Sequence, residues 1–197
     1  MELTTTTGGR APRSDARRNR QHILDVARQH FTERGVTGSL DAIAKQAGVG
    51  AGTLYRHFPS RDALLAALLG ARDEQIGVRR AEITSSAVDA GAALDEWLDA
   101  LIDWAGAFDG LPEPLRAAID EEASPLASTC QGYITVTDEF LHRAQDAGLA
   151  RRDVRGRELF LLALAVSWAQ GAAMADSASA TAMAGLLRSG WARTDAV

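Results

Sequence analysis

The segment of residues 39–58 constrains the fold most tightly, because a turn of only four residues separates two short helical stretches there. Ser39 is suited to cap the first helix, LDAIAKQA. Gly48 in the turn can adopt a positive φ, and the second helix is expected over about Ala51–His57. Small and apolar residues suit the inner positions: Ile43, Ala44, Val49 and Leu54. Two short helices joined by a turn that contains glycine form a helix-turn-helix.

The rest of the chain also favours helices, because Ala, Leu and Arg recur while runs of Val, Ile and Thr are missing. An all-α fold is therefore expected. Periodic apolar residues and the five prolines, which fall at boundaries, place the remaining helices. They are expected at about residues 16–34, 61–83, 89–108, 115–121, 126–147, 156–175 and 178–192.

This pattern predicts three parts: a disordered basic arm at residues 1–15, a helix-turn-helix domain at 16–62 and a helical body at 63–197. Their charges differ in sign. Residues 1–61 hold ten Lys and Arg against five Asp and Glu, a net charge of +5. The remainder carries −10, giving −5 overall. A basic front on an acidic body indicates that the front meets a polyanion. The arm itself is open to two interpretations, a solubilising tail or a minor-groove contact.

The composition of the second helix of the helix-turn-helix fits contact with DNA. In such a unit this helix enters the major groove, and its N-terminal residues approach the base edges. Thr53, Tyr55 and His57 are donors suited to phosphate oxygens, and Ala51 and Gly52 permit close approach to bases. The alternative for Tyr55 and His57 is that they cover the edge of the domain core.

Arg61 lies in the first turn of the next helix, where its charge opposes the helix dipole. Helix stability therefore does not explain this arginine, but a phosphate beside the positive helix end would.

The stretch GSLDAIAKQAGVGAGTLYRHFPSRDALLAALL resembles the DNA-binding domain of the tetracycline-repressor (TetR) family over roughly Arg18–Leu69. The family implies an all-helical homodimer with a ligand-binding, dimerising body. By position, the resemblance implies phosphate contacts from five residues (Ser39, Thr53, Tyr55, His57 and Arg61) and base-edge positions for three (Ala51, Gly52 and Arg56). Two positions depart from the pattern, since many relatives have Lys in place of Ala51 and a hydroxyl residue in place of Gly38.

The body of a protein that senses small molecules needs an apolar cavity with a few polar groups. The candidates to line it are Trp97, Leu101, Trp104, Cys130, Tyr133 and Thr137, with a purely structural core role as the alternative. The expected helices 156–175 and 178–192 are apolar beyond what one core needs, and small residues allow close helix approach, so an isologous four-helix dimer interface is the use that the family implies. A buried core helix is the alternative there.

Several classes of function are disfavoured. Cys130 and His142 are 12 residues apart on one expected helix, about 18 Å, too far to form a dyad. The four histidines show no metal-ligand spacing, and no Gly-rich phosphate loop is present. No catalytic residue, metal or cofactor is therefore expected. The polar N-terminus lacks an apolar signal segment, and the longest apolar stretch is too short to span a membrane. A single cysteine fits a cytoplasmic protein.

These features predict a ligand-responsive transcriptional regulator. We expect a repressor that binds an inverted-repeat operator as a homodimer and is released by a small, largely apolar effector. The alternative is a helical carrier or sequestering module in which DNA binding is vestigial.

Overall fold

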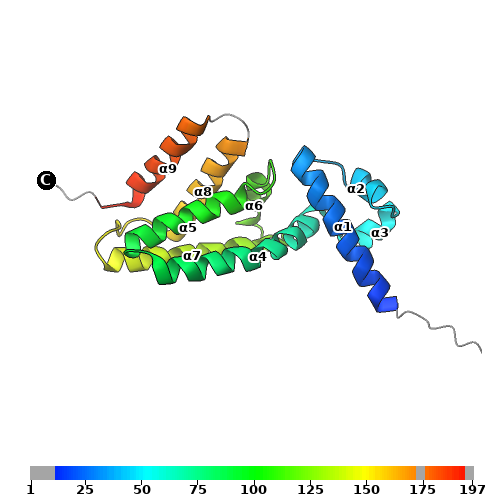
Figure 1. Ribbon diagram of the computed structural model, residues 1–197, viewed down its shortest axis with the longest axis horizontal. Helices are drawn as coiled ribbons and strands as arrows, with labels where there is room; N and C mark the ends of the chain where they lie inside the picture. The colour runs from blue at the N-terminus through cyan, green and yellow to red at the C-terminus, as the bar shows by residue number, and fades with distance from the viewer. Residues whose placement is uncertain (1–11, 172–175, 194–197) are drawn as a thin grey trace, which may run out of the picture.

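The computed structural model describes residues 12–171 and 176–193, which form nine helices and no strand (Figure 1). The prediction of an all-α fold is therefore confirmed. The helices are α1 (Pro12–Arg34), α2 (Leu40–Gln46), α3 (Ala51–His57), α4 (Arg61–Ser86), α5 (Ala90–Ala105), α6 (Pro112–Ala118), α7 (Ala127–Asp146), α8 (Gly156–Gly171) and α9 (Ser177–Trp191).

Two boundaries differ from the sequence-based expectation. Helix α1 begins at Pro12, so the prediction of disorder is wrong for residues 12–15. Proline suits the first helical position, and Asp15 in the first turn complements the helix dipole. Residues 1–11 of the predicted arm lie outside the described residues. Helix α4 runs without a break to Ser86, through both Gly70 and Gly77.

Helices α1–α3 form a three-helix head at one end of the molecule (Figure 1). Helix α2 contacts both α1 and α3, and α1 contacts α4. The core of the head consists of apolar side chains with almost no exposed surface, among them Ile23, Phe31, Ile43, Leu54 and Phe58. Burial of such side chains is what holds short helices like α2 and α3, which would be marginal in isolation.

Helix α4 connects the head to the body. It begins at Arg61, where the Ser60 hydroxyl accepts a hydrogen bond from the amide of Ala63 at 3.1 Å. In the body α5 packs against α4, α7 and α8, and α8 also contacts α6 and α9 (Figure 1). The predicted boundary between residues 62 and 63 therefore falls in the first turn of one continuous helix.

The head also touches the body through the turn between α1 and α2. The amide of Val36 donates to the carbonyl of Asp109 at 2.8 Å, and the rings of Phe31 and Phe108 meet edge to face at 6.1 Å. Gly35 has a φ of +69°, and a Cβ there would lie 2.9 Å from the Asp109 carbonyl oxygen. This turn therefore requires glycine for its backbone conformation and for its close approach to the body.

Candidate DNA-binding surface and ligand cavities

The turn between α2 and α3 has the geometry that the sequence indicates. Gly48 has a φ of +64°, and the amide of Val49 donates to the carbonyl of Ala44 at 3.0 Å. At the start of α2 the Ser39 hydroxyl accepts from the amide of Ala42 at 3.3 Å. The predicted cap and the predicted glycine turn are both confirmed.

One face of α3 is anchored in the head core and the other is open to solvent. Leu54 is fully buried and fixes the helix. Ala51, Gly52, Tyr55 and Arg56 are exposed, and Thr53 and His57 are half-buried. Tyr55 keeps 44% of its surface accessible, a large value for an aromatic side chain in a small domain. The structure thus brings these six predicted DNA-contact residues together on one short helix.

Two arginines near this face make contacts within the protein. The Nε of Arg56 donates to the carbonyl of Gly52 at 3.0 Å, and its Nη2 donates to the Thr53 hydroxyl at 3.3 Å. Arg61 is partly buried and donates from Nη1 to the carbonyl of Gly38 at 2.7 Å and to that of Val36. Arg61 therefore has a role in holding the α1–α2 turn, which the argument from the helix dipole did not foresee.

The glycine at position 38, unusual for the family resemblance, has a steric reason. A Cβ on Gly38 would lie 2.6 Å from Nε2 of His30. That ring is 3% exposed, and its Nδ1 is paired with Oε1 of Gln46 at 3.0 Å. A buried, hydrogen-bonded ring cannot easily move away, so a side chain at position 38 would be disfavoured.

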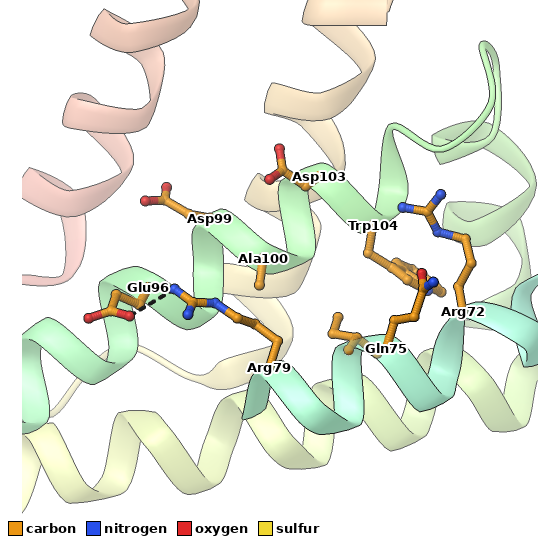
Figure 2. A pocket seen from close by; sticks show the side chains of 9 residues that line it. Arg72, Gln75, Arg79, Glu96, Asp99, Ala100, Asp103 and Trp104 are labelled. Carbon is orange, nitrogen blue, oxygen red and sulfur yellow. Dashed lines mark hydrogen bonds and ion pairs between the residues drawn. The ribbon is translucent and has the colours of Figure 1, made fainter. Parts of the chain in front are cut away.

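The body contains two neighbouring cavities of about 290 Å³ each, on either side of Ile76 in α4. The first, here called the Trp97–Tyr133 cavity, lies between α4 and α7, with Trp97 of α5 at its wall; its other lining residues are Asp73, Ile76, Gly77, Arg80, Ser128, Thr129, Gly132 and Val136. The second, here called the Arg72 cavity, lies between α4 and α5 (Figure 2). It is lined by Arg72, Gln75, Ile76, Arg79, Glu96, Asp99, Ala100, Asp103 and Trp104.

The six predicted ligand-contact residues divide between these cavities and the core. Trp97 and Tyr133 line the first cavity and Trp104 lines the second. Leu101, Cys130 and Thr137 are at most 1% exposed and line neither. All three lie on the inner faces of α5 and α7, in apolar or hydrogen-bonded positions. The sequence pattern alone therefore could not separate them from the cavity residues.

Thr137 instead makes a buried polar pair with Trp97. The indole Nε1 of Trp97 donates to the Thr137 hydroxyl at 3.0 Å, and that hydroxyl donates to the carbonyl of Tyr133 at 2.7 Å. The Trp97 ring also stacks on Phe140, with centroids 5.4 Å apart and planes at 21°. The pair therefore joins α5 to α7 with all of its side-chain donors satisfied.

Two groups near the Trp97–Tyr133 cavity have shifted acidities. Burial raises the pKa of the Cys130 thiol to about 11, and the thiol donates to the carbonyl of Leu115 at 3.3 Å. Burial and a 2.5 Å hydrogen bond to the Asp73 carboxylate raise the pKa of the Tyr133 phenol. Both groups are therefore neutral at physiological pH, and the cysteine has no thiolate to react as a nucleophile.

Helices α8 and α9 leave large apolar side chains uncovered. Leu162 and Trp168 on α8 are each 48% exposed, and Leu186 on α9 is 71% exposed. Phe160 and Leu164, on the side of α8 opposite Leu162, are almost fully covered, whereas Trp168 lies one turn after Leu164 and lines a groove beside Pro112 of α6. Exposed apolar side chains such as Leu162 and Leu186, on two adjacent helices, are typical of an association surface. The part of the predicted helix 156–175 beyond Gly171 lies outside the described residues.

Metal-binding clusters and membrane-spanning helices are both absent from residues 12–171 and 176–193. No group of three or more His, Cys, Asp and Glu side chains there is arranged to hold a metal ion. Within the same residues, no helix is long and apolar enough to cross a membrane.

The sequence interpretation missed the polar residues that α4 contributes to the cavities, above all Arg72. A signal for it exists in the sequence. Leu65, Leu68 and Ile76 lie on the buried stripe of α4, and Arg72 occupies the position between them, four residues from Leu68 and from Ile76. An arginine that interrupts an apolar helix stripe indicates a buried or cavity-facing charge rather than a solvated one.

Comparison with known proteins identifies the family. Residues 23–68 match the profile described as bacterial regulatory proteins, tetR family. Residues 89–193, more than half of the chain, match the C-terminal domain of SbtR-like transcriptional regulators. The chain belongs to the TetR family of transcriptional regulators.

Relatives of this TetR-family protein agree with the assignment. Over 53 residues it is 49% identical to an HTH-type transcriptional regulator of Staphylococcus aureus (strain USA300), a match that covers 26% of this chain and 29% of the relative. A TetR regulator of Streptomyces coelicolor matches with 28% identity and a TM-score of 0.58, over 89% of this chain and 99% of that one. The regulator FadR of Bacillus subtilis, solved with stearoyl-CoA, has the same fold at 21% identity and a TM-score of 0.61, over 86% and 98% of the two chains.

Proposed function

We propose that this TetR-family protein is a repressor that binds an inverted-repeat DNA operator as a homodimer and is released by a small effector. The observation that carries the DNA contact is the α3 face, where buried Leu54 fixes the helix and the Tyr55 and Arg56 side chains stand exposed. A helix held in this way can enter the major groove, with Ala51 and Gly52 close to the bases. Ser39, Thr53, Tyr55, His57 and Arg61 would then hold phosphates.

The test is selection of bound fragments from a random DNA pool at about 150 mM salt, because salt sets the non-specific background. An enriched inverted repeat supports a dimeric sequence-reading protein. Weak binding that depends steeply on salt, without enrichment, would contradict it and favour a body that acts without DNA.

Variants then test the contact map on the selected operator. Tyr55→Phe removes one hydroxyl and should weaken binding several-fold, while Arg56→Gln should weaken it and relax selectivity, by about 1–3 kcal/mol. Arg152→Gln is the matched control, because it removes the same charge from an exposed position in the body. Equal affinities of all three variants for the operator would refute the map.

The homodimer is assigned to the exposed apolar face of α8 and α9. Leu186→Glu and Leu162→Glu should each shift the protein toward monomer in sedimentation experiments, since a charge buried at the centre of an interface is costly. Val88→Glu is the control, because Val88 is 93% exposed but lies between α4 and α5. A dimer that tolerates both α8 and α9 substitutions would place the interface elsewhere.

The effector is assigned to the Trp97–Tyr133 cavity, whose lining is mostly apolar with a few polar groups, as ligand sites commonly are. A ligand there displaces operator only if it binds the DNA-incompetent arrangement more tightly. Screening apolar compounds for release of the confirmed operator complex tests this. Compounds that bind the protein, quench Trp97 fluorescence and leave the complex intact would contradict release from this cavity.

A further inference from the structure

The Arg72 cavity has no role in the function proposed above. It lies between the row Arg72, Gln75 and Arg79 of α4 and the row Trp104, Ala100 and Glu96 of α5 (Figure 2). The small side chain of Ala100, midway along its row, leaves room between the two helices. Its volume of about 290 Å³ corresponds to roughly ten water-sized groups.

Two buried hydrogen-bond donors at this cavity have no partner among the described residues. They are Nε of Arg72 and the indole Nε1 of Trp104, and the Trp104 side chain is only 3% exposed. Figure 2 shows the Arg72 guanidinium and the Trp104 ring at the same end of the cavity. A buried donor without an acceptor is unfavourable, so a ligand that brings an acceptor is favoured here once the Arg72 and Trp104 side chains turn to uncover these nitrogens, which the protein covers in this structure.

Arg79, the other arginine of the cavity, differs from Arg72 because its guanidinium has partners within the protein. Arg79 pairs with Glu96 at 2.9 Å (Figure 2) and with Glu82 at 3.5 Å. Its charge is thus already compensated within the protein. Arg72 forms no hydrogen bond or ion pair with the described part of the chain, so its charge is the one available to a ligand.

The remaining charges of the lining restrict what that ligand can be. Asp99 and Asp103 follow one another by four residues on α5, next to Glu96. Burial and its acidic neighbours raise the pKa of Asp99 despite the opposing effect of Arg188. A second anionic group on the ligand, beyond the one that Arg72 balances, is therefore disfavoured. Ile76 and Ala100 supply apolar surface between the end at Arg72 and Trp104 and the end at Arg79 and Glu96.

We propose that the Arg72 cavity is a second ligand site that binds a small monocarboxylate, with its carboxylate on Arg72 and Trp104 and its apolar part against Ile76 and Ala100. The planar guanidinium is the side chain best matched to a carboxylate. The carboxylates of Glu96, Asp99 and Asp103 in the lining disfavour a second carboxylate on the same ligand.

This site also adjoins the head. Arg72 and Gln75 line a further cavity of about 330 Å³, whose other walls include Arg28 and Thr32 of α1 and Phe108. The side chain that would hold the carboxylate is thus shared between the ligand site and the surface where α1 meets the body. A carboxylate bound to Arg72 therefore acts at the contact between α1 and the body, which orients the head. Any change in DNA affinity that results from this binding rests on the proposed function.

Binding is tested on the purified full-length protein without DNA. Benzoate, phenylacetate and 3-phenylpropionate are titrated while the indole Nε1–H resonances of the 15N-labelled protein are followed, with Trp104→Phe assigning the signal of Trp104. At least one acid should move that signal downfield. Its neutral amide, and the dicarboxylate phthalate, should bind at least about tenfold more weakly, because each loses or opposes the charge match.

Substitutions separate Arg72 from its neighbours. Arg72→Gln should weaken binding at least about tenfold. Arg79→Gln, on the same helix and in the same cavity but with a paired charge, should change it less than about threefold. If Arg72→Gln does not fold, Arg72→Lys replaces it, and the loss of the planar fork should still weaken binding.

Three results would overturn the proposal: no acid shifts Trp104 up to about 10 mM, acid and amide bind equally, or the Arg72 variant binds as the unmodified protein does. These outcomes are independent of operator binding. A protein that selects an operator but fails this titration refutes the carboxylate site alone. One that binds carboxylate at Trp104 but selects no operator refutes the proposed regulation and leaves the site standing.

Discussion

The buried pair of Trp97 and Thr137 yields the most discriminating stability prediction, through Thr137→Val. Valine keeps the branched shape but places a methyl group where the hydroxyl accepts the Trp97 Nε1–H at 3.0 Å. Both side chains are at most 1% exposed, so the indole N–H of the variant is left buried without an acceptor. Such a loss costs about 1–3 kcal/mol.

Thr135→Val is the matched control on the same helix. The Thr135 hydroxyl donates to the carbonyl four residues earlier, that of Gln131, at 2.9 Å. Thr137 makes the same kind of backbone bond to Tyr133 at 2.7 Å. Thr135 is exposed and no indole donates to it, so subtracting its effect from that of Thr137→Val leaves the contribution of the Trp97 bond.

The assay is equilibrium unfolding in urea at one fixed protein concentration, since association changes apparent stability. Thr137→Val should lower the free energy of unfolding by about 1–3 kcal/mol more than Thr135→Val does. In a Trp97→Phe background this difference should largely disappear, because the donor is gone. Equal stabilities of the two valine variants, within about 0.3 kcal/mol, would show that the pair does not hold α5 to α7.

Three further predictions follow from single positions. Gly70→Ala should stabilise the protein by about 0.5–1 kcal/mol in urea unfolding, because an added Cβ meets nothing within 4 Å in the middle of α4; an unchanged or lower midpoint would contradict this. Gly156→Ala should lower the melting temperature, since its Cβ would lie 2.5 Å from an Asp138 carboxylate oxygen that accepts the Gly156 amide; unchanged melting would refute the steric argument. Cys130 should resist thiol reagents in the folded protein at neutral pH, as its pKa is raised to about 11. Because folding raises the pKa of Cys130 from 9.0, the thiol contributes most to stability below pH 9.0, and this contribution should disappear as pH rises through 11. Rapid labelling of Cys130 without unfolding would disprove the predicted resistance to thiol reagents.

The features that the sequence predicted correctly are those set by residues close together in the chain. The Ser39 cap bonds to an amide three residues on, and the positive φ of Gly48 is a property of that residue alone. Periodic apolar residues likewise identified each of the long helices. Local chemistry of this kind is visible without knowing the tertiary structure.

What sequence reasoning missed depends on contacts between distant segments. Trp97 and Thr137 are 40 residues apart, so their spacing gives no sign that they satisfy each other rather than a ligand. The cavity at Arg72 exists only because α4 and α5 pack with Ala100 between larger side chains. In both cases the residue type was informative, but the choice between core and site required the packing.

Arg61 shows how a local argument can be sound and still incomplete. A cation in the first turn opposes the helix dipole, so some other interaction must compensate it. The carbonyls of Val36 and Gly38 do so within the protein, without any phosphate. Val36 in turn donates its amide to the carbonyl of Asp109. The start of α4, the α1–α2 turn and the segment after α5 are thus joined in series. Because both of its links at Val36 use the backbone, this connection is insensitive to side-chain substitution at that residue. A ligand that displaces α4 relative to α5 must therefore either break one of these bonds or carry the head with it.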